Sequence, residues 1–308
     1  MRFLYEEDGC PKYWLQILAA MFLMVFGTIV ISILFAEILV VVLGIKTVEE
    51  VQTYTLIPPL LTILSYALVS KLLLTMFKRA NRTTKEAMGL KLDSSSVRKM
   101  IFGFAVACLF VAIYLTAGVF SGRISVRQGE AGSSFLLFVI AEIATIIGEE
   151  FLFRGFILRV LMIKFPAYNA ILLLMAIVGI YTFAISWSGV IPAVFLLSQT
   201  LLLVEMAYKS GSLVMPISFH VMFNLLTRFF FGLNAIENSV MFSSVSDSFL
   251  FGNASAGIEA SFLMVFLFVF LSIIFVLYYK KINNESKEFI RISQKYKKEE
   301  TTKRSKKK

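Results

Sequence analysis

Cysteine, histidine and charged side chains are all scarce in this chain. Its 308 residues include two cysteines, Cys10 before the first long apolar run and Cys108 inside a later one. Two cysteines in such different settings, with no Cys-x-x-Cys spacing, exclude a disulfide framework and a cysteine-bound zinc site. The one histidine, His220, excludes a site built from several histidine ligands.

Charged residues make up only 16% of the sequence, whereas hydrophobic residues make up 58% and the mean hydropathy is +0.81. Soluble globular domains do not combine these values, so the composition indicates a polytopic membrane protein. The first apolar run is too long for a cleavable signal peptide and follows Glu6, Glu7 and Asp8, so we expect it to remain as a membrane span.

Eight apolar runs are each long enough to cross the roughly 30 Å of hydrocarbon in a bilayer. The sequence therefore predicts an all-α fold, a polytopic membrane helical bundle of about eight transmembrane helices. The predicted spans cover residues 14–43, 54–77, 100–120, 134–163, 169–187, 190–208, 213–231 and 260–279. Pro58 and the tight turn between the fifth and sixth runs leave open a re-entrant segment in place of a full crossing.

Basic residues predict the orientation, because cytoplasmic loops carry an excess of Lys and Arg. If the spans alternate across the membrane, most basic positions fall on one side. These positions are the loop 78–99, Arg159, Lys164, Lys209 and the tail 280–308. Arg123 and Arg127 fall on the other side but are outnumbered, so both termini are predicted to face the cytoplasm.

The C-terminal tail, Lys280–Lys308, carries twelve Lys or Arg residues against four Glu, which is a net charge of +8. Such a tail is attracted to anionic lipid headgroups. No aromatic or glycine-rich stretch accompanies it, as one would in an RNA-binding segment. We therefore expect anionic lipid, and no nucleic acid, as its partner.

Three charged residues interrupt the fourth apolar run: Glu149, Glu150 and Arg154. An ionised side chain at membrane depth costs roughly 2.5–3.5 kcal/mol, so a cluster of three needs an explanation. On a helix, Glu150 and Arg154 are i and i+4 neighbours that neutralise each other. Glu149 lies on an adjacent face, where it is a candidate general base for activating water. The alternative is that all three residues form one structural ion cluster.

The seventh run holds His220 and, four residues later, Asn224, whose side chains project from one helix face about a turn apart. Polar side chains in the interior of a membrane bundle tend to meet one another. We therefore expect Glu149, His220 and Asn224 to converge on one water-filled cavity. Glu142, seven residues before Glu149, either lines the same cavity or pairs with a neighbouring helix.

This set of side chains suits hydrolysis. Glu149 would deprotonate water, while His220 and Asn224 would hold the developing oxyanion or, with a metal, the metal-bound water. An ion- or proton-coupled transporter buries similar residues, but it is built from paired repeats with broken helices. The sequence contains no second copy of the charged cluster, which disfavours a transporter.

Two motifs, about 65 residues apart, are the most specific features of the chain. Glu149-Glu-Phe-Leu-Phe-Arg154 resembles the Glu-Glu-x-x-x-Arg motif of the CPBP family of membrane proteases, which includes CAAX prenyl endopeptidases and the bacterial bacteriocin-processing and Abi proteins. The segment Tyr208–Asn224, which ends in His220-Val-Met-Phe-Asn224, resembles the closing motif of that family. A weaker likeness is Met88-Gly-Leu-Lys-Leu92.

The resemblance covers residues 85–230 and implies an all-helical protease that cleaves a membrane-associated peptide or protein. It implies that Glu149 activates water and that His220 and Asn224 serve the cleavage site, with Glu150 and Arg154 completing the catalytic set. It also implies an integral membrane protein, which we expect in a bacterial plasma membrane.

One position departs from the family. The Phe-x-x-x-His motif expected between the other two reads Phe183-Ala-Ile-Ser-Trp187 here. A Trp indole has an N–H donor but no lone pair to bind a metal or accept a proton. Zinc is the one cofactor that stays open, with Glu149 and His220 as its ligands, although this pair matches the histidine-rich shells of zinc poorly. A metal-free glutamate mechanism is compatible with Trp187.

Trp187 also keeps a second interpretation open. In it the chain is a catalytically inactive relative that acts as a membrane scaffold, as a regulator of another membrane protein, or as a bacteriocin-immunity protein. The intact glutamate, arginine, histidine and asparagine motifs favour the protease instead.

The sequence divides into four predicted parts. These are 1–84, two N-terminal membrane helices and a basic cytoplasmic loop; 85–231, the CPBP-like catalytic core; 232–279, an outer loop and the last membrane helix; and 280–308, the basic tail. Within the third part, the polar residues 234–259 are expected to form a flexible loop.

Overall fold

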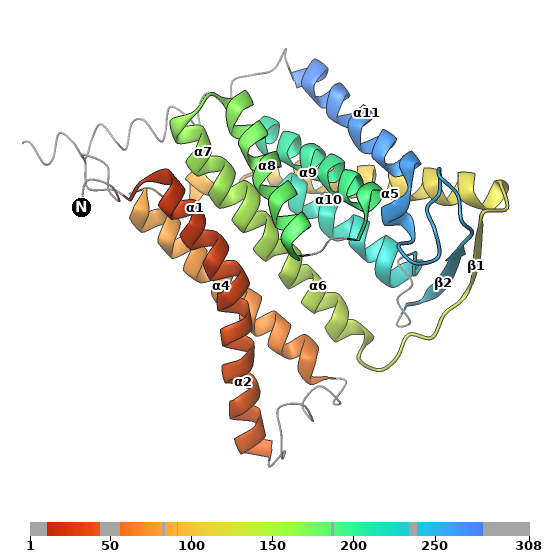
Figure 1. Cartoon of the computed structure of the whole chain (residues 1–308), viewed down its shortest axis with the longest axis horizontal. Helices are drawn as coiled ribbons and strands as arrows, with labels where there is room; N and C mark the ends of the chain where they lie inside the picture. The colour runs from red at the N-terminus through yellow and green to blue at the C-terminus, as the bar shows by residue number, and fades with distance from the viewer. Residues whose placement is uncertain are drawn as a thin grey trace, which may run out of the picture. The chain divides into compact units, whose positions relative to one another are not determined.

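The computed structural model describes residues 11–43, 56–81, 84–90, 92–185, 188–233 and 239–279. Helices dominate this part of the chain, which confirms the prediction of a helical membrane protein (Figure 1). Each of the eight predicted apolar runs overlaps a helix. The chain divides into two compact units. Unit 1 holds the described residues of Met1–Lys91 and Leu136–Ala170, and unit 2 holds those of Leu92–Phe135 and Ile171–Asn283.

Several helices have the length and apolar composition of membrane spans. In the described residues these are Tyr13–Val42, Ile57–Ala80, Ser96–Phe120, Ala167–Ala184 and Val190–Ser210. The apolar helices Val214–Phe230 and Phe262–Leu277 are shorter. Residues 135–164 are helical as well, but this segment carries the charged cluster. The number of crossings and the side on which the termini lie stay predictions, as does the four-part division of the chain.

The described residues of unit 1 form three helical rods. The first is α1 (Tyr13–Phe22), η1 (Leu23–Gly27) and α2 (Thr28–Leu43); the second is α4 (Ile57–Ala80); the third is α6 (Phe135–Glu150), η3 (Phe151–Ile157) and α7 (Leu158–Lys164); and the 3-10 turn η2 (Lys85–Met88) follows α4. η1 and η3 are π-helical, so these rods contain a wider turn. Pro58 and Pro59 stand in the first turn of α4, where no backbone N–H is needed, so they begin the helix.

Polar contacts join the rods of unit 1. The hydroxyl groups of Ser32 on α2 and Ser65 on α4 share a hydrogen bond of 2.7 Å. At the other end of α4, Asn81 Nδ2 donates to Gln16 Oε1 at 2.9 Å. Hydrogen bonds between membrane helices contribute about 0.6 kcal/mol each on average. These two hydrogen bonds therefore add little stability, and their main effect is to fix the position of the first rod along α4.

Unit 2 contains the remaining elements. They are α5 (Ser96–Phe120), β1 (Ile124–Gln128), α8 (Ala167–Ile185, with its first residues in unit 1), α9 (Val190–Ser210), α10 (Val214–Asn224), the π-helical η4 (Leu225–Phe230), β2 (Met241–Val245), the 3-10 turn η5 (Ile258–Ala260) and α11 (Phe262–Tyr279). α5 begins behind a polar turn, in which Asp93 Oδ1 accepts hydrogen bonds from the Ser95 N–H at 2.9 Å and the Ser95 hydroxyl at 2.6 Å. The hydroxyl contact lowers the pKa of Asp93.

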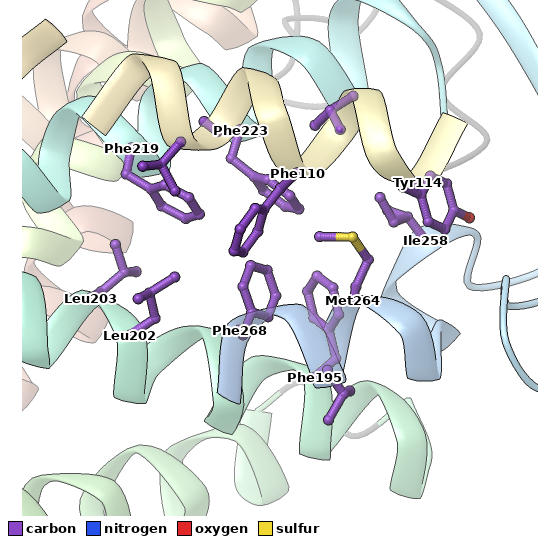
Figure 2. Close-up of a cluster of buried hydrophobic side chains, with 14 of the residues drawn as sticks. Phe110, Tyr114, Phe195, Leu202, Leu203, Phe219, Phe223, Ile258, Met264 and Phe268 are labelled. Atoms are coloured by element: carbon purple, nitrogen blue, oxygen red, sulfur yellow. The ribbon is translucent and has the colours of Figure 1, made fainter. Parts of the chain in front are cut away.

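The core of unit 2 is aromatic. Figure 2 shows Phe110 of α5, Phe195 of α9, Phe219 and Phe223 of α10, and Phe268 of α11 gathered in one cluster. Phe195 and Phe268 meet edge to face, with ring centroids 5.2 Å apart. Pairs of this kind contribute about 0.5–1.5 kcal/mol beyond the area that they bury. The cluster therefore holds four helices of unit 2 together and fixes how α10 is rotated.

An antiparallel pair of strands was not predicted from the sequence. β1 and β2 align with Ile124 opposite Val245 and Gln128 opposite Met241 (Figure 1). The prediction of a flexible loop over residues 234–259 is therefore wrong for its described part, 239–259. That part contains β2, η5 and two isolated bridges, between Ser248 and Gly252 and between Asn253 and Gly257.

Candidate active site

The first motif spans the junction between α6 and η3. Glu149 and Glu150 end α6, and Arg154 lies in the middle of η3. Arg154 Nη1 donates to Glu150 Oε1 at 3.0 Å, which confirms the predicted pairing of these two side chains. Both are buried, with exposed fractions of 0% for Glu150 and 3% for Arg154. The pair therefore neutralises its own charge inside unit 1.

Glu149 differs from Glu150 in its exposure. The Glu149 side chain is half-buried, as is that of Glu142, seven residues earlier on α6. Adjacent residues on a helix project in different directions, so Glu150 faces Arg154 while Glu149 is partly accessible. The two carboxylates of the motif are thus separated by their surroundings.

Helix α4 supports the backbone that carries both glutamates. A Cβ atom at Gly148 would lie 2.6 Å from Cδ1 of Tyr66, so only glycine allows α4 to approach α6 this closely. Further along, Phe77 of α4 and Phe156 of η3 meet edge to face at 5.5 Å. Gly148 directly precedes Glu149, so the Tyr66 ring limits how far the motif can move.

Both motifs run directly into a π-helical turn. η3 follows Glu150, and η4 follows Asn224. π-helical turns are rare in proteins, but those that occur often lie at functional sites, because the wider turn redirects the side chains that follow it. η1 of unit 1 has the same geometry but carries no motif. A π-helical turn therefore supports the assignment of a functional site made from the motifs, but does not identify a site by itself.

The second motif lies on α10. His220 is 9% exposed, and Asn224, the last residue of the helix, is half-buried. The start of α10 is defined by Gly211, whose φ is +63°, and by Ser212, whose hydroxyl accepts a hydrogen bond from the Val214 N–H at 3.2 Å. The spacing of four residues on one helix confirms that His220 and Asn224 share a face.

The position of α10 is fixed by a close crossing with α5. A Cβ atom at Gly103 would lie 2.6 Å from the Met215 carbonyl oxygen and 2.9 Å from the Phe219 nitrogen. Phe219 and Phe223 stack at 5.8 Å and point into the aromatic cluster (Figure 2). His220 and Asn224 each follow one of these phenylalanines, so they project from the adjacent face of α10.

Two buried charged residues lie outside the predicted site. Arg159 of α7, which the sequence predicts on the cytoplasmic side, is 1% exposed. Glu205 on α9 is 7% exposed and is not among the predicted site residues. The signal was present, since Glu205 interrupts the apolar residues 201–207 in the same way as the motif glutamates interrupt theirs.

The predicted site residues form two groups. Glu149, Glu150 and Arg154 belong to unit 1, whereas His220 and Asn224 belong to unit 2. Each group is defined within its own unit, and their convergence on one cavity stays a prediction. Trp187 lies outside the described residues.

Zinc stays a prediction, and the donors within the described ranges match it poorly. No group of three or more His, Cys, Asp or Glu side chains in the described ranges could hold a metal ion. His220 is the only histidine of the sequence, whereas catalytic zinc sites use three protein ligands rich in histidine or cysteine. We therefore derive no catalytic step through a metal.

Comparison with known proteins supports the two motifs. Residues 131–226 match the family model of the type II CAAX prenyl endopeptidase Rce1-like proteins. The matched range contains both Glu149–Arg154 and His220–Asn224, and it confirms the resemblance that these motifs carry. No curated protein and no solved structure matches the chain significantly.

Proposed function

We propose that this chain, whose residues 131–226 match the Rce1-like family model, is an intramembrane endopeptidase of the CPBP type that hydrolyses a peptide bond in a membrane-associated peptide or protein. The observation that carries the proposal is the difference between two adjacent glutamates. Glu150 is buried against Arg154 at 3.0 Å. The role of general base therefore falls to Glu149, which is half-buried on α6.

In the proposed reaction Glu149 accepts a proton from water while the water oxygen attacks the carbonyl carbon of the scissile bond. N–H groups of His220 and Asn224 donate hydrogen bonds to the oxyanion of the tetrahedral intermediate. Glu149 then returns the proton to the leaving nitrogen as the C–N bond breaks, which yields a carboxylic acid and an amine. Every step uses side chains of this chain.

The membrane setting supports this class of substrate. The first motif lies in a helical segment that we predict to be a membrane span, and both motifs are largely shielded from solvent. We place the protein in a bacterial plasma membrane, with the basic tail 280–308 on anionic lipid headgroups of the cytoplasmic leaflet. The substrate bond then lies at or within the membrane.

One feature favours a second function. Trp187 occupies the position at which the family carries a histidine, and an indole cannot act as a base. In this alternative the chain is an inactive relative that acts as a scaffold, as a regulator of another membrane protein, or as a bacteriocin-immunity protein. The buried Glu150–Arg154 pair would then serve stability alone.

The first prediction tests catalysis. Membrane peptides are quantified by mass spectrometry in cells that express the wild type, Glu149→Gln or Glu37→Gln in the same way, and the abundance of each protein is measured alongside. Glu37 is an exposed glutamate on α2 and serves as the control for loss of a carboxylate within a span. We expect Glu149→Gln to lower cleavage by about 100-fold or more, because it removes the general base. Glu37→Gln should match the wild type.

Protein abundance separates the two functions. If Glu149→Gln is as abundant as the wild type and leaves the peptide pattern unchanged, the protease is rejected and the scaffold is favoured. If only the abundance falls, Glu149→Asp provides a second comparison, because it keeps the charge and shortens the side chain. A stable aspartate variant with wild-type cleavage would also contradict a positioned base.

A further inference from the structure

β1 is hydrogen-bonded to β2 along one edge only, as far as the structure describes the chain. The Gly129 N–H donates to the Val240 carbonyl at 3.0 Å, and the Ser246 N–H donates to the Arg123 carbonyl at 2.9 Å. The odd-numbered positions of β1 are therefore the ones bonded to β2. In an antiparallel ladder the positions between them direct their N–H and C=O groups to the opposite edge.

The opposite edge is thus formed by the backbone of Ile124, Val126 and Gln128. No other backbone hydrogen bond within the described ranges reaches these three residues. Residues 125–128 are all exposed. β1 joins α5 to α6, so this edge lies in a connection between helices, where water and other chains can reach it.

The strand is held rigidly from behind. Ile124 is 3% exposed and belongs to the aromatic core cluster of unit 2, where it packs against Gly118. On β2, the Ser243 hydroxyl donates to the Phe231 carbonyl at 2.6 Å. β1 is already extended and anchored before a partner binds. Binding therefore costs less conformational entropy than it would if a loop of this chain had to become ordered.

The charge at this edge selects the partner. Arg123 and Arg127 are both exposed, lie four residues apart and share one face of the sheet. Arg127 is held over the Phe242 ring, with Cζ 4.7 Å from the ring centroid. A strand added beside β1 would meet both guanidinium groups on one face, so acidic side chains at positions i and i+4 of that strand would match them.

We propose that the free edge of β1 binds an extended acidic peptide segment, which adds to the β1–β2 sheet as a third strand. The segment carries two acidic residues four positions apart. A second copy of this chain is disfavoured as the occupant. In an antiparallel pair of β1 strands centred on Val126, both Arg127 side chains would lie on the same face, where their positive charges would repel each other. The inference concerns binding alone and does not rest on the proposed protease activity.

The test measures binding of a defined peptide to the full chain in lipid nanodiscs. The probe is a fluorescent peptide of about ten residues in which Thr and Val alternate, with Glu at positions i and i+4. Fluorescence anisotropy should show saturable binding to the wild type. Val126→Pro should weaken it about 10-fold, because proline removes the outward N–H and leaves the ladder to β2 intact. Val126→Thr keeps the N–H and should bind like the wild type.

A second pair of measurements tests the charge. Arg127→Gln should weaken binding of the acidic peptide several-fold. The same substitution should leave binding of a matched peptide, with Gln in place of Glu, unchanged. Added salt should weaken binding of the acidic peptide to the wild type more than binding to Arg127→Gln.

The proposal is overturned by any of three results. The acidic peptide fails to bind the wild type, or it binds Val126→Pro and the wild type equally, or the wild type forms dimers that Val126→Pro lacks. Should the proline variant unfold, an N-methylated peptide replaces it as the probe. N-methylation at alternate residues removes the N–H groups of the added strand, so equal binding of that peptide to the wild type also rejects strand addition.

Discussion

Arg154 gives two neighbouring glutamates different surroundings. Its guanidinium group lies 3.0 Å from the Glu150 carboxylate, and both side chains are buried. Two buried charges have lost their hydration, and their mutual attraction compensates for that loss only while both are present. Glu149, one residue earlier, is half-buried and is not the partner of Arg154 in this pair. The chemistry that we propose for Glu149 thus depends on a neighbour that is held in place.

The second prediction removes one member of the pair. Arg154→Met removes the Arg154 cation that lies 3.0 Å from the buried Glu150 carboxylate, so we expect the free energy of unfolding to fall by about 3–5 kcal/mol. Thermal unfolding of the purified protein in detergent measures this. The double variant Glu150→Gln with Arg154→Met is the control, because it removes both charges of the pair, and it should recover most of the loss. Equal stability of the single and double variants would contradict a buried ion pair.

Helix α10 carries His220 and Asn224, and its position depends on a single glycine of α5. The crossing at Gly103 leaves no room for a Cβ atom, since the two nearest atoms belong to the α10 backbone. Backbone cannot move aside as a flexible side chain can. Any side chain at position 103 therefore shifts the helix on which the second motif lies.

The third prediction compares two glycines of unit 2. Gly103→Ala should lower the free energy of unfolding by about 1–3 kcal/mol through overpacking, and it should also reduce cleavage, because α10 moves with His220. Gly179→Ala on α8 is the matched control, since its added Cβ would lie 3.8 Å from the nearest atom, Leu197 Cδ2. Thermal unfolding and the membrane-peptide assay provide the two measurements. If the two alanine variants behave alike, the crossing does not position the motif.

For the whole molecule, the orientation in the membrane follows from the basic residues. η2 lies in the predicted cytoplasmic loop, and β1 lies in a connection predicted on the outer side. Glu86 of η2 and Val126 of β1 are both exposed, so each position suits chemical labelling. The two positions should differ only in the side of the membrane on which they lie.

The fourth prediction tests this orientation in intact cells. Cys10 and Cys108 are first replaced by serine, and then either Val126→Cys or Glu86→Cys is introduced. A membrane-impermeant maleimide should label the Val126→Cys variant in intact cells, but the Glu86→Cys variant only after permeabilisation. Labelling of both variants in permeabilised cells is the control for accessibility. The reverse pattern would invert the predicted orientation.

Local features of the sequence determined much of this protein. Long apolar runs predict helices, because a helix satisfies every backbone hydrogen bond within its own segment in lipid. The Glu150–Arg154 pair and the shared face of His220 and Asn224 follow from a spacing of four residues on a helix. These predictions depend on residues close together in the chain.

Other features were decided only by the tertiary structure. The hydroxyl groups of Ser125 and Ser244 share a hydrogen bond of 2.7 Å although they are 119 positions apart. The alternation of Ile124 and Val126 with polar residues is typical of a strand, yet nothing near them in the chain supplies the partner. The requirement for glycine at positions 103 and 148 likewise arises from helices that are distant in sequence. The sequence by itself therefore determined the helices and the spacing within each motif, since both depend on neighbouring residues. The tertiary structure decided the strand pairing, the close helix crossings and the burial of Arg159, because these depend on which segments pack together.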